Sequence, residues 1–531
     1  MTKDESKIRN LKSKIVRLIF AAIVVFVYFF ALGAVPLIGP DESRYAQVAR
    51  EMFERNDFVT PKLGGFNWFE KPALLYWLQI FFYKIFGVSE FAARFGSALC
   101  GLGTIFSLWI LGKNSATENT EKPGEIEKER KLSVNSVLSV ANADFAFWLF
   151  IVSASSIGLL TFSRGASFDI ILTFPMTAAL VAFFIFDQSI RKSFAAYRLP
   201  LVAFYFFVGV ALLAKGLIGI VFPFAIVAFY YVLSRKLPSK AFVFSLFWGT
   251  ILSLSVASIW YVPMYLANGW TFIDEFFIQH QFQRYTSNKY RHPQPFWFFL
   301  LVLPLMTLPW LPFFLASIWD FIKVQNSKFK AQNRENSPRL RVSASPIRIF
   351  AFCWLLVPLV FFSFSGSKLP GYILPALPAA LVLTAEYVSR FVRNNRTRRI
   401  VLQAVALVTF ACIIVALQFF VMSFARGETV KTLIETADAQ GFDKEKIFSF
   451  NTISHNAEFY GAGRLIRTAD GKQRRFFSTA EIIEKMKING ESGALVLIPL
   501  EHLNLLTGSD SAEAKVLGDN GELAIVSVKL K

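Results

Sequence analysis

Cysteine is scarce in this sequence: Cys100, Cys353 and Cys412 are the only three in 531 residues. All three fall inside apolar stretches, which excludes a disulfide framework and the paired spacing of a metal site. The chain also lacks internal repeats and low-complexity tracts. Its first apolar stretch, about 15–37, is too long for a signal-peptide core and has no clear small-x-small cleavage site. We therefore expect a retained membrane span there.

Charged residues are also few, at 18%, whereas 54% of the chain is hydrophobic and 16% is aromatic, with 60 Phe. Mean hydropathy is +0.46, which suits lipid-facing helices rather than a soluble globular domain. The net charge of +19 could indicate nucleic-acid binding. Because the basic residues lie between hydrophobic stretches, we interpret them instead as determinants of membrane topology. We expect contact with a lipid bilayer and no nucleic-acid partner.

Apolar stretches long enough for a helix to cross a bilayer, which takes roughly 20 residues, recur along the chain. The sequence around Ala214-Lys215-Gly216 also permits one bent helix, and 72–86 permits a further span. About eleven spans are predicted, near 15–37, 90–112, 134–160, 169–187, 199–215, 217–233, 241–265, 295–319, 347–364, 371–388 and 400–423.

Lysine and arginine mark alternate loops and so fix the predicted orientation. The N-terminal segment and the loops at 191–198, 235–240, 320–348 and 389–399 are strongly basic, which places them in the cytoplasm. The 113–133 loop is mixed in charge and contributes little. The loops predicted to face outward are then 38–89, 161–168, 214–216, 266–294 and 365–371.

The tail differs in composition from the rest of the chain. Segments Lys446–Phe450 and Ala494–Ile498 are typical of strands, and Ala480–Lys487 of a helix. We predict a membrane domain over 1–423, with 38–89 as its first outer loop, and a small α/β domain over 424–531. An odd number of spans places that domain outside the cytoplasm.

The first outer loop carries paired charges before two helical patterns. Asp41 opens an amphipathic helix, where an acid is also an ordinary N-cap, and Arg44 one turn later keeps it ionised. Glu70 and Lys71 precede a second apolar helix, about 72–86. Lys71 beside exposed helix N–H groups suits a phosphate, although an interfacial lysine that only snorkels fits equally well.

Three further outward segments carry polar side chains. Arg164 and Asp169 lie at one membrane edge, where Asp169 is either a cap or a partner of Arg164. His280 and Arg284 lie in an aromatic-rich segment, where an isolated histidine is most often a hydrogen-bonded surface residue. The remaining segment, 365–372, is a tight loop whose glycines allow close backbone approach. Its Lys368 and Tyr372 are candidates for binding a phosphate.

Charge is costly near a bilayer, so acids and cations gathered on one face indicate a functional site. The cations suit an anionic leaving group such as a lipid phosphate, and an ionised aspartate suits a general base. A transporter or flippase would instead place charges near the bilayer midplane within paired repeats. A receptor or assembly protein would not require outer acids surrounded by cations.

The motifs resemble, in order over about 15–390, those of the bacterial lipid A aminoarabinose transferases. That family belongs with the protein O-mannosyltransferases in the GT-C class of polyprenyl-phosphate-sugar-dependent glycosyltransferases. The tail resembles the family's outer domain only loosely. The matching segments are Gly-Pro-Asp-Glu-Ser-Arg-Tyr-Ala at 39–46, Phe-Glu-Lys-Pro at 69–72, Lys-Gly-Leu-Ile-Gly at 215–219, Phe-Gln-Arg at 282–284 and Gly-Ser-Lys-Leu-Pro-Gly-Tyr at 366–372.

The resemblance implies a GT-C membrane fold and an inverting glycosyltransferase on the periplasmic face of the bacterial inner membrane. Its donor would be a sugar on undecaprenyl phosphate, and its acceptor lipid A or another envelope glycan. A protein hydroxyl is the alternative acceptor. We expect a multi-pass monomer. The resemblance makes Asp41 the essential acid and Asp169 a second functional acid, and it assigns the lipid phosphate to Arg44, Lys71, Arg284 and Tyr372.

The family pattern also places a divalent metal on Glu70 and a histidine. Here the aligned position is Gln279, and His280 is its neighbour. Because an amide is a poor zinc ligand and imidazole a good one, we expect no required cofactor and leave open a metal at Glu70 and His280.

The alternating basic loops predict a cytoplasmic N-terminus and an outward tail after about residue 424. Reporter fusions in the 113–133 loop and at the C-terminus should therefore give opposite signals in intact cells. Identical signals from the two fusions would contradict the predicted orientation.

Overall fold

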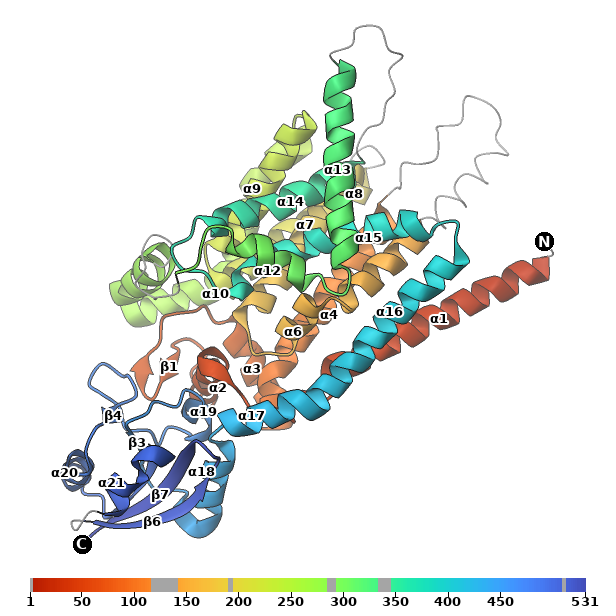
Figure 1. Ribbon diagram of the computed structural model, residues 1–531. Coiled ribbons are helices and arrows are strands. Elements are labelled where there is room, and N and C mark those ends of the chain that lie inside the picture. The colour runs from red at the N-terminus through yellow and green to blue at the C-terminus, as the bar shows by residue number, and fades with distance from the viewer. Residues whose placement is uncertain (1–2, 116–141, 190–193, 284–292, 333–344, 509–511) are drawn as a thin grey trace, which may run out of the picture. The chain divides into compact units, whose positions relative to one another are not determined.

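A computed structural model describes residues 3–115, 142–189, 194–283, 293–332, 345–508 and 512–531 (Figure 1). Most of the predicted 113–133 loop, parts of the 191–198 and 320–348 loops, and Arg284 lie outside these residues. The chain forms two compact units. The first comprises Met1–Phe30 and Ser97–Cys412, and the second Ala31–Gly96 and Ile413–Lys531. The predicted membrane domain, 1–423, and α/β domain, 424–531, concern which residues lie in the membrane, and this division stays a prediction.

The first unit is helical, and α7 packs against α8, α8 against α10, and α9 against α14. Helices suit an apolar sequence because they satisfy every backbone hydrogen bond internally. Besides a helix over Asn142–Ala154, the unit is built mainly from α1 (Lys3–Phe29), α4 (Glu90–Asn114), α6 (Ile157–Ser163), α7 (Phe168–Ser189), α8 (Phe194–Lys215), α9 (Ile218–Ser234), α10 (Lys240–Ile273), η1 (Asp274–Gln283), α12 (Phe298–Met306), α13 (Leu311–Gln332), α14 (Pro346–Ser363), η2 (Pro370–Ala376), α15 (Leu377–Val392) and α16 (Arg396–Val415).

Seven helices in the described residues are long and apolar enough to cross a membrane, or nine if two bent helix pairs each count as one span. The chain is therefore a multi-pass membrane protein. The bent pairs are Asn142–Ala154 with Ile157–Ser163 and Phe298–Met306 with Leu311–Val324. The seven helices are Glu90–Asn114, Phe168–Ser189, Arg198–Lys215, Lys240–His280, Pro346–Ser363, Pro370–Val392 and Arg396–Ala425.

Two of the eleven predicted spans, 15–37 and 217–233, are not among these seven helices and two bent pairs. The stretch 15–37 is interrupted because α1 ends at Phe29, and 217–233 forms the 17-residue α9. At a rise of 1.5 Å per residue, α9 is roughly 25 Å long, at the short end of the range for a membrane-spanning helix, so its span stays a prediction. A single bent helix around Lys215 is wrong, because Gly216 separates α8 from α9 with a left-handed φ of 77°.

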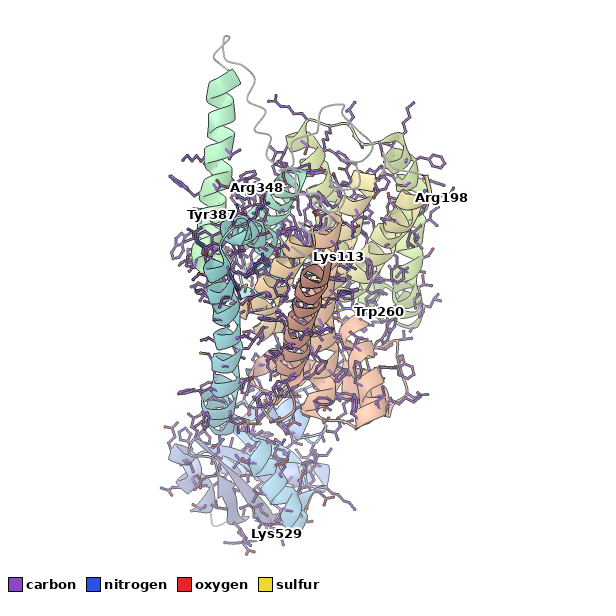
Figure 2. The ribbon with its side chains drawn as sticks, turned by 90° about the vertical axis from the view of Figure 1, so that its right-hand side faces the viewer. Lys113, Arg198, Trp260, Arg348, Tyr387 and Lys529 are labelled. Carbon is purple, nitrogen blue, oxygen red and sulfur yellow. The ribbon has the colours of Figure 1, made fainter. Side chains whose placement is uncertain are left out.

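Basic residues of different predicted cytoplasmic loops share one end of the helical unit, as Arg198 and Arg348 do in Figure 2. Arg348 is paired with Asp320 and, at 3.0 Å, with Glu386, and Arg390 pairs with the same Asp320 at 2.7 Å. These ion pairs join α13, α14 and α15. Largely buried charges are stable only when paired in this way.

The second unit begins with α2 (Gly39–Glu54), the short strands β1 (Lys62–Leu63) and β2 (Phe66–Asn67), and α3 (Leu74–Phe86). It continues through η3 (Ala416–Val421), α17 (Met422–Glu428), α18 (Lys431–Ala437) and η4 (Asp438–Phe442) into a five-stranded sheet. The sheet order is β4-β3-β5-β7-β6, with β3 parallel to β4 and β5 and the other pairs antiparallel.

The predicted strands and helix of the tail are confirmed. The prediction at Lys446–Phe450 corresponds to β3 (Ile447–Phe450), that at Ala494–Ile498 to β5 (Gly493–Pro499), and that at Ala480–Lys487 to α20 (Thr479–Asn489). The other elements are α19 (Ala457–Tyr460), β4 (Arg475–Phe476), η5 (Leu500–His502), α21 (Leu503–Thr507), β6 (Ala512–Asp519) and β7 (Leu523–Leu530).

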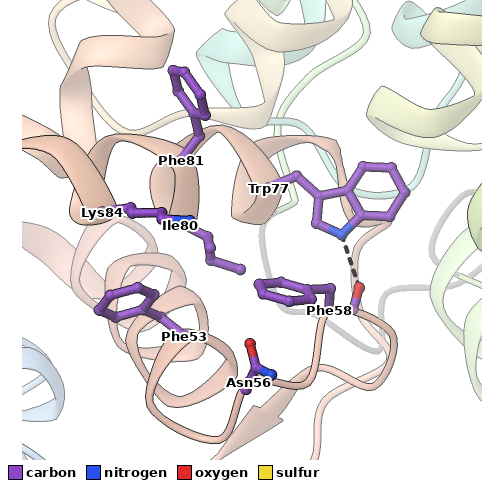
Figure 3. Close-up of a pocket in the computed structure, with 7 residues that line it drawn as sticks. All are labelled: Phe53, Asn56, Phe58, Trp77, Ile80, Phe81 and Lys84. Carbon is purple, nitrogen blue, oxygen red and sulfur yellow. Dashed lines mark hydrogen bonds between the residues drawn. The ribbon is translucent and has the colours of Figure 1, made fainter.

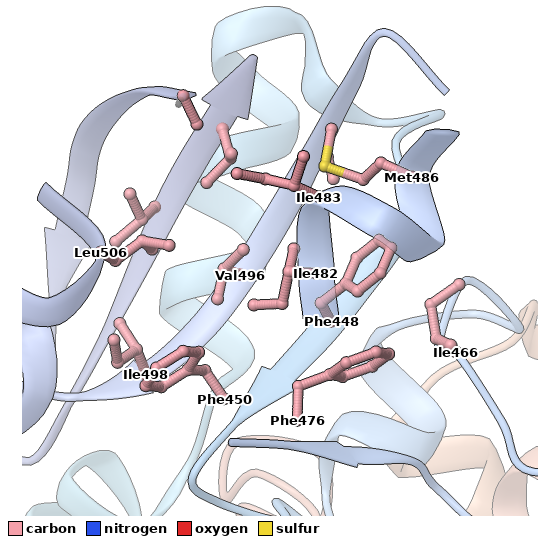
Figure 4. Packing of buried hydrophobic residues seen from close by; sticks show 14 of the residues in the cluster. Phe448, Phe450, Ile466, Phe476, Ile482, Ile483, Met486, Val496, Ile498 and Leu506 are labelled. Atoms are coloured by element: carbon pink, nitrogen blue, oxygen red, sulfur yellow. The ribbon is translucent and has the colours of Figure 1, made fainter. Parts of the chain in front are cut away.

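Alternate residues of the central strands face opposite sides of the sheet, so each side has its own apolar core. One core packs the sheet against α20 (Figure 4) and includes Phe448, Phe450, Val496, Ile498, Val526, Val528, Ile482 and Met486. The other packs it against α18 and includes Ile447, Leu495, Leu497, Ile525, Leu433 and Ile434.

A buried arginine fixes the start of the second unit. Arg94 forms two 2.7 Å hydrogen bonds to the Glu42 carboxylate. It also donates to the backbone carbonyl oxygens of Leu32, Val35 and Pro36. One guanidinium thus satisfies four groups and determines how the chain enters α2.

Replacing Arg94 should be strongly destabilising. Arg94→Met leaves Glu42 and three carbonyls without their partner, and breaking a buried pair typically costs about 3–5 kcal/mol. Thermal unfolding of the purified protein should show a clear fall in the midpoint. Lys472→Gln is the control, because its pair with Asp470 is 80% and 56% exposed. Equal effects of the two substitutions would contradict a structural role for Arg94.

Candidate functional site

Asp41 lies in the first turn of α2 and is paired with Arg44. The N-cap of α2 is Ile38, and no side chain caps it, so the interpretation of Asp41 as an N-cap is wrong. The predicted ion pair is confirmed: Arg44 Nη2 lies 2.7 Å from Asp41 Oδ1. The Asp41 side chain is 49% exposed. This acid is therefore held by one cation and remains accessible to a substrate.

Arg44 is fixed from several directions. Its Nε donates to the Pro40 carbonyl at 2.9 Å, and its guanidinium lies 5.5 Å from the centre of the Trp68 ring. Burial disfavours the charged form, but the carboxylates of Glu70 and Asp41 outweigh it and raise the pKa of Arg44. Arg44 is therefore a permanent cation that is held by several contacts.

Glu70 and Lys71 form a second pair in the same unit. Lys71 Nζ lies 3.0 Å from Glu70 Oε1, and both side chains are largely buried. Burial raises the pKa of the buried Tyr45 and Tyr76 phenols, and the Glu70 carboxylate raises it further. The two pairs thus form a cluster of two acids and two cations bordered by neutral tyrosines.

The tail contributes a residue that the sequence did not single out. Helix α19 packs against α2, and Arg50 of α2 donates to the Phe459 carbonyl at 3.5 Å. His455, just before α19, has its pKa lowered by burial and then by the positive charge of Arg44. No local pattern identifies His455, because its position depends on packing between segments about 400 residues apart.

In the first unit, Asp169 is paired with a lysine from another helix. Its carboxylate forms a close ion pair with Lys215, the last residue of α8. Lys215 Nζ also lies 5.1 Å from the centre of the Tyr372 ring. Arg164 donates to the carbonyls of Val27, Tyr28 and Phe30. Asp169 therefore pairs with Lys215, whereas the sequence had suggested Arg164 as its partner.

The loop before η2 approaches Asp169 closely. A Cβ atom on Gly371 would lie 1.9 Å from Asp169 Oδ2, so only glycine fits. The predicted close backbone approach is confirmed at this residue. Lys368 is buried and donates to the carbonyls of Ser365 at 2.7 Å and Gln294 at 3.0 Å. Its ammonium therefore helps to hold the loop.

The metal prediction remains untested. His280 lies in η1, and Gln279 beside it donates to Asp274 Oδ2 at 2.7 Å. Within the described residues, no group of three or more His, Cys, Asp or Glu side chains is placed to hold a metal ion.

Comparisons with known proteins agree with this description. Residues 70–120 match the family of dolichyl-phosphate-mannose-protein mannosyltransferases. The undecaprenyl phosphate-alpha-4-amino-4-deoxy-L-arabinose arabinosyl transferase of Shewanella sediminis is 30% identical over 74% of this chain and 62% of its own length. The enzyme of the same name from Aeromonas salmonicida is 28% identical over 68% and 58%. The chain thus spans about three-fifths of the length of these curated relatives.

Two solved structures match nearly the whole chain. ArnT from Cupriavidus metallidurans bound to undecaprenyl phosphate has a TM-score of 0.74 at 21% identity, covering 96% of this chain and 97% of that one. Its apo state gives the same TM-score at 22% identity, covering 97% and 98%. The chain is therefore a multi-pass membrane protein with the GT-C fold of these structures. The curated relatives named here are arabinosyl transferases of the kind that the motifs resemble, and the chain is similar to them over about 70% of its length.

The close approach of Gly371 to Asp169 can be tested with a double-mutant cycle. Gly371→Ala forces its methyl group into the carboxylate, and such overpacking typically costs about 1–3 kcal/mol. In an Asp169→Ala background the cost should shrink, because the obstructing oxygen is gone. Thermal unfolding measures the cost of Gly371→Ala in the unmodified protein and in the Asp169→Ala background. Gly427→Ala, with no atom within 4 Å of its Cβ, is the control. An undiminished cost in the Asp169→Ala background would show that the clash lies elsewhere.

Proposed function

We propose that this protein is an inverting glycosyltransferase of the bacterial inner membrane. It moves a sugar from undecaprenyl phosphate to lipid A or another envelope glycan on the periplasmic face. The support comes from relatives named as undecaprenyl-phosphate aminoarabinose arabinosyl transferases. The observation that carries the proposal is the half-exposed carboxylate of Asp41, held by Arg44 within the cluster that contains Glu70 and Lys71.

Asp41 is the proposed general base. The Asp41 carboxylate lies beside Arg44 and at the positive end of the α2 dipole, and both stabilise its negative charge. It takes the proton of the acceptor hydroxyl or phosphate as the acceptor oxygen attacks the anomeric carbon. The bond between that carbon and the phosphate oxygen breaks on the opposite side. Its electron pair leaves with the polyprenyl phosphate, and the configuration at the sugar inverts.

The cations stabilise the leaving phosphate. Negative charge grows on its oxygen as the sugar departs, so preorganised positive charge is worth more in the transition state than in the ground state. Arg44 and Lys71 are the proposed contacts in the second unit. In the remainder of the chain we propose Tyr372, Lys368 and Arg284 as phosphate-binding residues.

Asp169 is the proposed second acid. Lys215 forms an ion pair with it and places an ammonium group near the Tyr372 ring. Because Gly371 touches the carboxylate, the Asp169 side chain has little freedom to turn. We propose that this pair orients the loop that carries Tyr372 and Lys368 rather than transferring a proton.

A protein hydroxyl is the second candidate acceptor, since residues 70–120 match the dolichyl-phosphate-mannose-protein mannosyltransferases. Mass spectrometry of lipid A, total glycolipids and envelope proteins from cells with and without the gene separates the two. A sugar mass added to a glycolipid supports the first acceptor, and one added to a protein supports the second. A lipid or sugar flippase, the candidate from another class, would change the location of a glycolipid without adding a new sugar mass.

Asp41→Asn should abolish most turnover while leaving the protein folded. Asp41 does not cap α2, so the amide should cost little stability, whereas loss of a general base typically lowers rates by about 10²–10⁴-fold. Turnover and donor binding are measured with purified protein reconstituted in membranes, and donor binding should change little. Glu54→Gln is the matched control, because Glu54 is an exposed acid paired with Arg50 on the same helix.

If Asp41→Asn turns over normally while Asp169→Asn is inactive, the two acids have exchanged roles. If both variants are active, the enzymatic interpretation of the first outer loop is wrong.

A further inference from the structure

A cavity lies between the end of α2 and the exposed side of α3. Its volume is about 530 Å³, within the range of small-molecule binding sites. None of the acids and cations described above lines it. Figure 3 shows the seven lining residues, four of them aromatic: Phe53, Asn56, Phe58, Trp77, Ile80, Phe81 and Lys84.

Helix α3 belongs at the surface of a bilayer. It has 13 residues and is therefore roughly 20 Å long, too short to cross a hydrocarbon core of about 30 Å. One side packs on α2, yet Phe81 and Ile85 are 57% and 54% exposed on the other. Exposed aromatic and aliphatic side chains on a short helix are unfavourable in water and favourable among acyl chains.

The walls of the cavity are preformed. The Trp77 indole N–H donates to the Phe58 carbonyl at 2.8 Å, which fixes the loop against α3 (Figure 3). Phe53 lies 6.4 Å, ring centre to ring centre, from the buried Tyr83. Asn56 has a left-handed φ of 53° and turns the chain after α2. A site with fixed walls loses little conformational entropy when it is filled.

The charge of the lining residues indicates which kind of molecule the cavity binds. Lys84 is the one ionisable side chain among the lining residues, and no acid accompanies it. A lysine at the end of an apolar helix extends its methylene chain along the apolar wall and presents its ammonium at the headgroup level. Its natural partner is a phosphate attached to a hydrocarbon chain.

We propose that this cavity binds one acyl chain of the acceptor lipid and that Lys84 pairs with a phosphate of that lipid. The proposal rests on the proposed function, since it requires a phosphate-bearing glycolipid as acceptor. Asp41 and Phe53 lie twelve residues apart on α2, or roughly 18 Å along the helix axis. The lipid is thus anchored at one end of α2 and reacts near the other, which gives the enzyme a preference for acylated acceptors.

The first test measures binding without any donor, so that it does not depend on turnover. Delipidated, purified protein is titrated with lipid A and with dephosphorylated lipid A. Trp77→Ala and Phe81→Ala should each weaken binding of both about tenfold, because each removes a large apolar contact. Ile85→Ala, on the same helix but outside the cavity, is the control and should leave binding unchanged. Unchanged affinity in the Trp77 and Phe81 variants would overturn the proposal.

Lys84 is tested by the contrast between the two lipids. Lys84→Gln should weaken lipid A binding about tenfold and leave the dephosphorylated form unaffected, whereas Lys84→Arg should retain both. An equal loss for both lipids would contradict the pairing with phosphate.

The second test separates an acceptor site from a site for a structural lipid. In membrane-reconstituted turnover, Trp77→Ala should raise the KM for lipid A and leave kcat at saturating lipid nearly unchanged. Lost binding with an unchanged KM would mean that the cavity holds a structural lipid, and the proposal would fall. If the unmodified protein transfers no sugar, the proposed function fails, while the binding test still decides whether the cavity recognises a phosphate-bearing lipid.

Discussion

Ionised groups that lie close to apolar surroundings must be paired or hydrogen-bonded, and the ion pairs described above follow that constraint. Arg94 is enclosed by Glu42 and backbone carbonyls, and Asp169 is held by Lys215. Asp41 differs, because its partner Arg44 leaves nearly half of the carboxylate exposed. The same physics that explains the structural pairs therefore singles out Asp41 as an acid that is paired and still exposed.

The pairs that were predictable from the sequence are the local ones. Asp41 and Arg44 are three residues apart on a helix, so helical spacing alone places them together. The pairing of Lys215 with Asp169 joins two helices across 46 residues, and no spacing rule reveals it. Apolar periodicity likewise located β3, β5 and α20. The predicted spans 15–37 and 217–233 stay predictions, because α1 ends at Phe29 and α9 has 17 residues.

The second unit contains both the first outer loop, which carries Asp41, and the tail. Tyr460 of α19 accepts a hydrogen bond from the Leu37 amide at 2.8 Å and donates to Glu90, which also pairs with Lys431 at 2.6 Å. The segment that carries Asp41 is thus packed together with the tail. The sequence distinguished the tail as a small α/β domain by its composition, whereas these contacts are not predictable from it, because long-range packing leaves no mark on local composition.

The most direct test of the central claim is the stereochemistry of sugar transfer by the purified protein. Undecaprenyl-phosphate-linked aminoarabinose and lipid A are incubated with the protein in membranes, and the product is analysed by nuclear magnetic resonance. Direct attack by the acceptor should give stoichiometric release of undecaprenyl phosphate and an anomeric configuration opposite to that of the donor. A product with the donor's configuration, or release of undecaprenyl phosphate with no glycosylated acceptor, would contradict direct attack by an acceptor activated at Asp41.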